Sequence, residues 1–370
     1  MTTSSLSNYQ LRSAASNASQ TSESSSANNN SAEGETVLVA SRLSHASLAE
    51  REERQQALDR LEILQTVGTG SYGRVLVVRD RESSAYFALK VFSITHVIQS
   101  LQTEHVKSEK DILSVISHPF IVQLYWTHHS DQFLYMLLDY VPGGELFAYM
   151  RQKVTFDLKS ALFYICEIIL AFEYLHSLQI IYRDLKPENI LLDAEGHVKL
   201  VDFGFAKKIQ NKTFTTCGTP EYLSPELFKG TGHNKSTDWW SLGILLYEML
   251  TGATPFNPNQ NTTEIPARVL AGKIAWPRTI DEPTKAFIKK LLTQNSERRL
   301  GSGRNGSREV KEQPIFASIR WDDVYARKLR PPIVPSVKHP GDTSCFDHYD
   351  EDWRSAPFAS DRELALFSNF

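Results

Sequence analysis

Residues 182–189 read Tyr-Arg-Asp-Leu-Lys-Pro-Glu-Asn, and this octapeptide is the most informative stretch of the sequence. It places two carboxylates, two cations and an amide in one short segment, and Pro187 prevents that segment from continuing as a helix. Asp184 can accept a hydroxyl proton, Lys186 can stabilise a transferring phosphoryl group, and Asn189 can offer an oxygen to Mg²⁺. The segment is therefore predicted to be a catalytic loop.

A further carboxylate follows in the tripeptide Asp202-Phe203-Gly204. A carboxylate together with an amide oxygen suits a hard cation that also takes phosphate oxygens. Asn189 and Asp202 are therefore the predicted metal ligands. Each of these short motifs is common when taken alone.

Residues 68–75 read Gly-Thr-Gly-Ser-Tyr-Gly-Arg-Val, a glycine-rich loop whose backbone amides can approach phosphate oxygens closely. Such a loop also occurs in plain hairpin turns and in Rossmann dinucleotide folds, where a helix opens directly after the third glycine. Here the strand-like run Val-Leu-Val-Val follows at residues 75–78, and no Walker-type phosphate loop is found. The pattern favours a strand-turn-strand flap over phosphates.

Lys90 stands in the apolar run Tyr-Phe-Ala-Leu-Lys at residues 86–90, where a lysine needs a partner or a ligand. A phosphate would supply one. Glu109 lies in the next helical segment, where it could face Lys90 and hold its ammonium group toward the phosphates. Taken singly, each residue could equally be an ordinary surface charge.

Taken jointly and in this order, the motifs resemble those of eukaryotic protein kinases, from about Leu61 to Phe316. The resemblance implies ATP and Mg²⁺ as cofactors and Lys90, Glu109, Asp184 and Lys186 as catalytic residues. It also implies that Glu226 pairs with Arg299 and that Asp238 braces the catalytic loop. The implied ATP-binding residues are Val67, Gly68, Thr69, Gly70, Ser71, Gly73, Val75, Ala88, Lys90, Leu138, Val141, Glu145 and Leu191.

Three features narrow the resemblance to the AGC group and, within it, to the catalytic subunits of cyclic-AMP-dependent kinases. Tyr182 replaces the usual histidine of the catalytic loop. Residues 341–349 resemble the tail that crosses the nucleotide site, with Phe346 closing over adenine. The chain stops directly after Phe-Ser-Asn-Phe at 367–370, which resembles a motif that docks into the small lobe. The Ser/Asn-rich front segment resembles fungal members more than animal ones.

The resemblance also implies how activity is switched on. Thr215 occupies the activation-loop position that is phosphorylated in this family, and Arg183, Lys207 and His105 are the cations expected to read the phosphate. Thr216 is a departure, because the family commonly has a leucine there that lines the pocket for the residue after the target.

Substrate choice is predicted from charge. Glu145, Glu188 and Glu248 match the acidic positions by which cyclic-AMP-dependent kinases recognise arginines upstream of the target Ser or Thr. The implied partners are protein substrates with upstream arginines and an inhibitory regulatory subunit that cyclic AMP displaces. No cyclic-nucleotide pocket is evident in the sequence, so that sensing is expected in trans.

The predicted fold class is α+β, a bilobal kinase fold. Residues 1–43 are predicted to be a disordered tail and 44–60 a leading helix. The kinase domain is expected over 61–316, with an antiparallel-sheet lobe at 61–139, a hinge at 140–144 and a mostly helical lobe at 145–316. Residues 317–370 are expected to form the C-terminal tail of AGC kinases. Strands are predicted at 61–67, 74–79, 86–91, 120–126 and 133–139, and helices at 106–115, 158–178, 236–250 and 282–292.

Composition excludes several other classes. The 370 residues carry 40 Lys and Arg against 43 Asp and Glu, so no global basic surface indicates nucleic acid or anionic lipid as a partner. Three cysteines and no paired motif favour a reducing compartment over a disulfide framework. No membrane insertion is expected, and the predicted location is the cytoplasm, the nucleus or both.

Two alternatives remain at this stage. A catalytically dead scaffold would require a lesion at Lys90, Asp184 or Asp202, and none is found. Another AGC kinase with a different regulator would be favoured by a lipid-binding or coiled-coil domain, for which the sequence shows no room.

Overall fold

The small lobe is an antiparallel sheet with helices beside it, and its strands follow from short runs rich in apolar, β-branched and aromatic residues. The structure is a computed structural model, and it describes residues 52–70, 73–215, 218–257, 261–351 and 355–370. The strand order is β1-β2-β3-β5-β4. The bounds are β1 (Leu61–Gly70), β2 (Gly73–Asp80), β3 (Tyr86–Ser93), β4 (Leu124–His129), β5 (Phe133–Asp139), α2 (Ile94–Gln99) and α3 (Thr103–Leu113).

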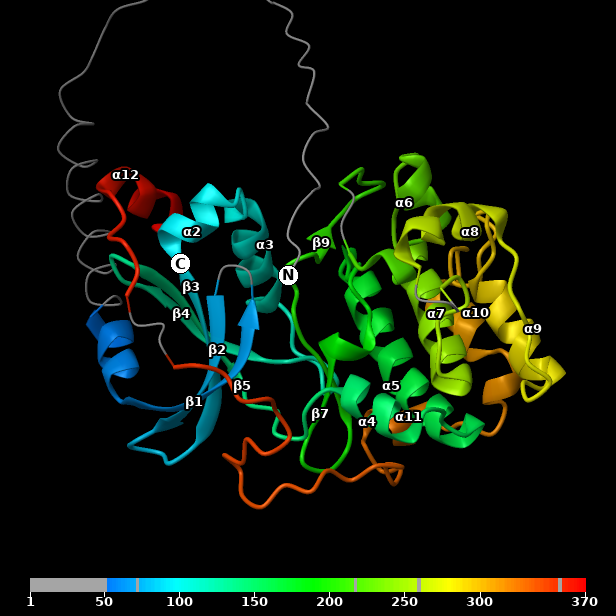
Figure 1. Ribbon diagram of the computed structural model, residues 1–370, viewed down its shortest axis with the longest axis horizontal. Helices are drawn as coiled ribbons and strands as arrows, with labels where there is room; N and C mark the ends of the chain where they lie inside the picture. Colours follow the sequence, from blue (N-terminus) through cyan, green and yellow to red (C-terminus); the bar gives the residue numbers. More distant parts are fainter. Residues whose placement is uncertain (1–51, 71–72, 216–217, 258–260, 352–354) are drawn as a thin grey trace, which may run out of the picture. The chain divides into compact units, whose positions relative to one another are not determined.

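The large lobe is mostly helical (Figure 1). Its central helix α7 is apolar on nearly every side and is accordingly buried, with Trp239 and Trp240 fully enclosed. The other bounds are α4 (Leu146–Lys153), α5 (Leu158–Ser177), α6 (Pro225–Lys229), α7 (Ser236–Thr251), α8 (Ile265–Ala271), α9 (Glu282–Leu291), α10 (Ser307–Lys311) and α11 (Trp321–Tyr325).

Two small two-stranded sheets carry the chemistry-bearing loops of the large lobe. Strands β6 (Ile180–Ile181) and β9 (Lys207–Lys208) pair, and so do β7 (Ile190–Leu192) and β8 (Val198–Leu200). The catalytic loop lies between β6 and β7, and the Asp-Phe-Gly segment lies between β8 and β9. The two small sheets therefore bring the two acidic segments to one place.

The predicted α+β bilobal fold is confirmed, and the long predicted helices and most strands match within a few residues. The strand predicted at 120–126 is wrong in its bounds. Strand β4 begins only at Leu124, because Val122 donates its backbone N–H to Leu200 of β8 and Leu200 donates to Phe120. The apolar run is thus divided between the two lobes. Helix α2, which the sequence analysis missed, begins after Ser93, whose hydroxyl caps it.

The C-terminal segment returns to the small lobe, where helix α12 (Asp361–Leu364) lies near α2 (Figure 1). Phe367 and Phe370 are buried against α3, with Lys107 over the first ring and Lys110 over the second. The predicted docking of this motif is confirmed. Of the predicted leading helix, residues 52–59 are described and helical, while the predicted tail at 1–43 lies outside the described residues.

No helix among the described residues is both long and apolar enough to cross a membrane.

Candidate active site

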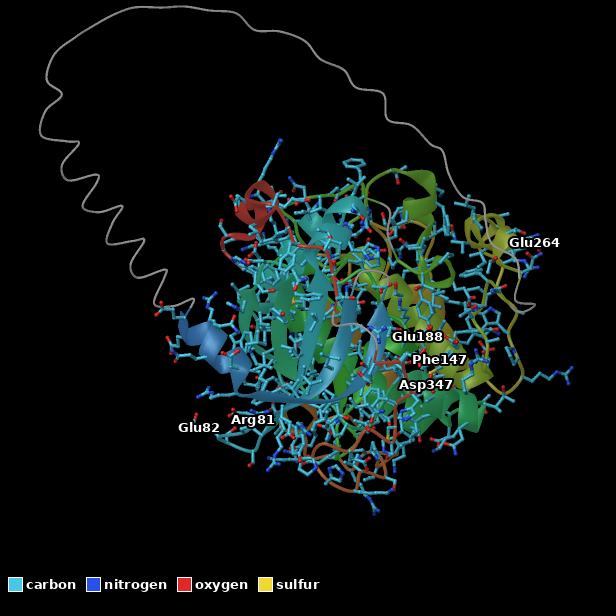
Figure 2. All side chains as sticks on the ribbon, turned by 60° about the vertical axis from the view of Figure 1, so that its left-hand side comes forward. Arg81, Glu82, Phe147, Glu188, Glu264 and Asp347 are labelled. Atoms are coloured by element: carbon cyan, nitrogen blue, oxygen red, sulfur yellow. The ribbon has the colours of Figure 1, made fainter. Side chains whose placement is uncertain are left out.

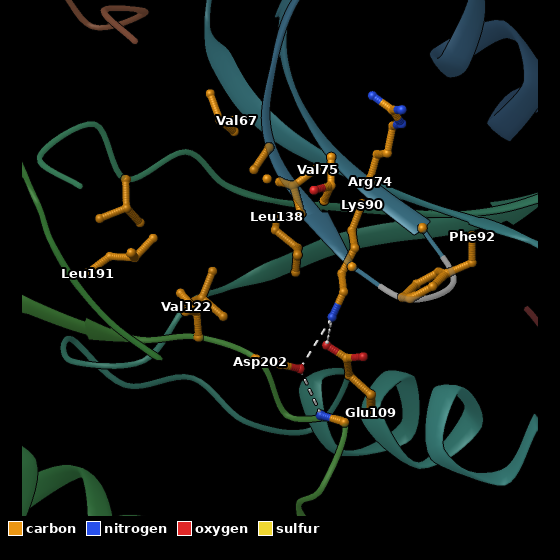
Figure 3. Close-up of a pocket in the computed structure, with 18 of the residues that line it drawn as sticks. Val67, Arg74, Val75, Lys90, Phe92, Glu109, Val122, Leu138, Leu191 and Asp202 are labelled. Atoms are coloured by element: carbon orange, nitrogen blue, oxygen red, sulfur yellow. Dashed lines mark hydrogen bonds and ion pairs between the residues drawn. The ribbon is translucent and has the colours of Figure 1, made fainter. Parts of the chain in front are cut away.

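Lys90, Glu109 and Asp202 meet at the base of the cleft between the lobes (Figure 3). Lys90 Nζ lies 2.6 Å from Glu109 Oε1 and 3.5 Å from Asp202 Oδ1. Burial opposes the charged form of Lys90, but the two carboxylates outweigh it and raise the pKa of Lys90. The same ammonium group lowers the pKa of Asp202. A protonated lysine and an ionised aspartate therefore face one cavity.

That cavity, of about 340 Å³, lies under the β1–β2 flap. Every predicted ATP-binding residue that the structure describes lines it, and only Ser71 lies outside the described residues. Val67, Ala88 and Leu138 supply apolar surface from three strands. Phe346 of the tail completes the lining and lies 6.2 Å from the ring of Tyr140. An apolar slot that ends in charged groups fits a planar base joined to phosphates.

Gly73 is the flap glycine whose identity the packing requires. A Cβ atom there would lie 2.2 Å from the carbonyl oxygen of Val91 on β3. Any side chain would therefore push the flap strand away from the sheet.

The catalytic loop concentrates its polar contacts on Asp184. Its Oδ2 atom accepts from Asn189 Nδ2 at 2.7 Å and lies 3.1 Å from Lys186 Nζ. Oδ1 is buried and has no hydrogen-bond partner among the described residues. Burial raises the pKa of Asp184, and Lys186 partly opposes that rise. A buried acceptor without a donor is suited to receive a substrate hydroxyl.

Asp238 holds the backbone of this loop from within α7. It is fully buried, and it accepts the backbone N–H groups of Tyr182 at 3.0 Å and Arg183 at 2.8 Å. Tyr182, which stands in place of the usual histidine, packs edge-on against Phe203 at 5.1 Å. The predicted brace is confirmed, and so is the predicted buried pair of Glu226 with Arg299, at 2.7 Å.

The predicted metal ligands are neighbours in the structure. Val201, beside Asp202, donates its backbone N–H to the carbonyl of Asn189 at 3.0 Å. The side-chain nitrogen of Asn189 is used by Asp184, so its amide oxygen is the atom that can be offered to a cation. The Asp202 side chain is 49% exposed toward the cavity. One carboxylate and one amide oxygen beside a phosphate site fit Mg²⁺, which is usually held by few protein ligands plus phosphate oxygens.

The three cations predicted to read a phosphate on Thr215 also converge. Arg183 donates to the Thr215 carbonyl oxygen at 3.4 Å, and Lys207 donates to the hydroxyl of Thr213 at 3.0 Å. Burial lowers the pKa of His105, and Arg183 and Lys207 lower it further. His105 is therefore close enough to both cations to feel their charge. Thr216 lies outside the described residues.

The three predicted substrate-binding glutamates form one acidic cluster. Burial raises the pKa of Glu145, and the charges of Glu188 and of Asp347 in the tail raise it further. Figure 2 labels Glu188 and Asp347. Burial likewise raises the pKa of Glu248 to about 7, and Glu188 adds to that effect. Tyr222 donates its hydroxyl to Glu248. Negative charges held this close together favour a cationic ligand.

Comparisons with known proteins agree with this geometry. Residues 61–316 match the family described as protein kinase domain. The chain is a protein kinase. It is 51% identical over 315 residues to the human cAMP-dependent protein kinase catalytic subunit PRKX, covering 85% of this chain and 88% of the relative. The match to catalytic subunit 3 of Drosophila melanogaster is 50% identical and covers 86% of this chain and 54% of the relative.

These matches place the kinase in the family of cAMP-dependent catalytic subunits, and it is a serine/threonine protein kinase. Membership implies the use of ATP and Mg²⁺. The suggested resemblance to fungal members is not borne out. The type 3 kinase of Saccharomyces cerevisiae is 44% identical, over 80% of this chain and 74% of its own length, which is below the 51% identity to the human relative. Composition of the front segment was a poor guide, since such segments vary freely.

Sequence reasoning missed several residues of the site. Val122 and Tyr140 line the cavity, and Asp347 joins the acidic cluster. Val122 could have been suspected from its place in an apolar run that precedes β4. Asp347 gave no such signal, because its nearness to Glu145 depends on the path of the tail.

Proposed function

We propose that this kinase transfers phosphate from ATP to Ser or Thr residues that lie downstream of arginines. The observation that carries the proposal is the acidic cluster of Glu145, Glu188 and Glu248, in which burial raises the pKa values of Glu145 and Glu248 and the charge of Glu188 raises both further. An arginine guanidinium would relieve that repulsion and can pair with a carboxylate through two hydrogen bonds. Cationic side chains upstream of the target are therefore the expected selectivity element.

The chain's own residues divide the chemistry among them. Asp184 would orient the acceptor hydroxyl through its free Oδ1 atom, and Lys186 would balance charge on the transferred group. Lys90, held by Glu109, would position the nucleotide phosphates. Asp202 and Asn189 would hold Mg²⁺, which neutralises phosphate charge when bound. Catalysis is then mainly positioning and electrostatic stabilisation.

We also propose that a cyclic-AMP-binding regulatory subunit inhibits the kinase by occupying the acidic substrate groove. The names of the matched relatives support this, since they are cAMP-dependent catalytic subunits. The proposal requires the inhibitor to offer cations to the glutamate cluster. A location in the cytoplasm, the nucleus or both stays a prediction.

The test is phosphate transfer from Mg-ATP to a peptide with two arginines upstream of serine, using enzyme phosphorylated on Thr215. Asp184→Ala should abolish transfer, and a peptide with alanines for arginines should be a poor substrate. Added regulatory subunit should block transfer, and cyclic AMP should restore it. Transfer that ignores the regulatory subunit would indicate another AGC-type regulator, and equal use of both peptides would refute the arginine preference.

A further inference from the structure

The tail crosses the nucleotide cavity as a strap, defined here as residues 342–351. Near the hinge, the Tyr140 hydroxyl donates to the backbone carbonyl of Asp342 at 2.6 Å. Midway, Phe346 lines the cavity. At the far end, Glu351 reaches strand β1. The strap therefore connects the hinge to the flap across the mouth of the site.

Glu351 makes a two-point contact with a single residue of the flap strand. Its Oε1 accepts the backbone N–H of Thr66 at 2.8 Å, and its Oε2 accepts the Thr66 hydroxyl at 2.7 Å. Thr66 is fully buried. Among the described residues, strand β1 is at the edge of the sheet and pairs only with β2, so its outward N–H groups have no strand partner there. The Glu351 carboxylate supplies the acceptor that the sheet cannot.

Other strap residues hold the same two strands. Thr343 donates its hydroxyl to Gln65 Oε1 at 2.7 Å, and the Gln65 amide nitrogen lies 2.9 Å from His348 Nδ1. On β2, Arg74 donates to the backbone carbonyl of Asp350. The flap is thus gripped on both of its strands next to the cavity.

We propose that Glu351 is a positioning residue that sets the flap for ATP through Thr66. Thr66 is followed directly by Val67 and Gly68, which line the cavity, so a shift of Thr66 moves the lining itself. Glu351 is not among the lining residues. With the contact made, the flap is already ordered for the nucleotide. Without it, ATP binding must order the flap, which weakens affinity and leaves the chemistry at Asp184 unchanged. This inference rests on the proposed ATP site.

The decisive variants are Glu351→Ala, Glu351→Gln and Thr66→Val, with Asp361→Ala as an exposed tail carboxylate for control. Glu351→Ala should raise KM for ATP by about tenfold, with kcat unchanged or higher, as expected for the loss of one to two hydrogen bonds to a charged group. Glu351→Gln should recover most of the affinity, because its amide oxygen can accept from the Thr66 N–H and its nitrogen can donate to the hydroxyl. Thr66→Val should raise KM for ATP by a smaller factor. In the double variant, Glu351→Ala should raise KM by less than it does in the wild-type background, because both changes remove the same contact.

Hydrogen exchange distinguishes a local loss of the Glu351–Thr66 contact from a general loss of stability. Hydrogen exchange should accelerate in residues 61–79 of the ATP-free Glu351→Ala enzyme and not in α7. An unchanged KM for ATP, or a lower kcat at unchanged KM, would overturn the proposal, and so would Glu351→Gln behaving like the alanine variant. If the wild-type enzyme fails to bind ATP, the proposed function fails. An unchanged rate of hydrogen exchange in residues 61–79 would independently refute the proposal that the Glu351–Thr66 contact orders the flap.

Discussion

Removal of the Asp238 carboxylate should disable the catalytic loop without touching the cavity. This fully buried side chain accepts three hydrogen bonds: Tyr182 N at 3.0 Å, Arg183 N at 2.8 Å and His176 Nε2 at 2.7 Å. Arg183 has a φ of 69°, a left-handed conformation that costs a non-glycine residue about 1–2 kcal/mol. Asp238→Ala would leave two buried N–H groups without an acceptor, each costing about 1–3 kcal/mol. The local penalty is therefore about 2–6 kcal/mol.

Relief of that penalty requires the loop to change shape, and Asp184 follows directly after Arg183. A displacement of about 1 Å in a catalytic group can cost about 100-fold in rate, so kcat at saturating Mg-ATP and peptide should fall by about that factor. The melting temperature should fall by about 5–10 °C. Asp238→Asn should be intermediate, because its carbonyl can still serve Tyr182 and His176 while its nitrogen faces the Arg183 N–H group.

The assay pairs steady-state phosphate transfer with thermal melting, and it uses Asp322→Ala, an exposed carboxylate on α11, as the control. Both quantities should be unchanged in the control. An Asp238→Ala enzyme with kcat within about twofold of wild type would refute the argument that this carboxylate fixes the loop. A large loss of stability with full activity would show that the loop is held by other contacts.

Three further predictions concern neighbouring groups. Asp184→Asn should lower kcat by about 10²–10⁴-fold with little change in KM for ATP, measured by peptide phosphorylation. Glu248, whose pKa is about 7 chiefly because it is buried, loses its negative charge as pH falls; KM for an arginine peptide should rise from about pH 8 to about pH 6, and Glu248→Gln should flatten that rise. Arg299→Met should destabilise the large lobe by about 3–5 kcal/mol in denaturant unfolding, because it leaves Glu226 buried without its partner, and adding Glu226→Gln should recover part of the loss.

The parts of the site that the sequence could predict are those in which neighbouring residues carry the chemistry together. Asp184, Lys186 and Asn189 lie within six residues, so their convergence needs only a non-helical loop. The pairing of Lys90 with Glu109 could not be predicted from neighbouring residues, because Lys90 lies on β3 and Glu109 on α3. The order of the motifs along the sequence indicated this pairing.

The tail contacts were beyond local pattern. Glu351 and Thr66 are 285 residues apart, and neither stands in a periodic or motif context that marks it. An exposed-looking acidic run such as 347–351 is equally typical of a solvated segment. Strand β4 failed for a related reason, because the apolar character of residues 120–122 reports burial and does not say which lobe buries them.

The site also holds features that weaken the free enzyme and that a substrate would relieve. The buried Oδ1 atom of Asp184 has no donor among the described residues, which costs about 1–3 kcal/mol. In the glutamate cluster, burial raises the pKa values of Glu145 and Glu248, and the negative charge of Glu188 raises both further. A substrate hydroxyl would donate to Oδ1 of Asp184, and a substrate arginine would pair with the glutamate cluster. A peptide that offers both should therefore bind better than the sum of two fragments that each offer one, because the shared backbone removes the cost of ordering the second group.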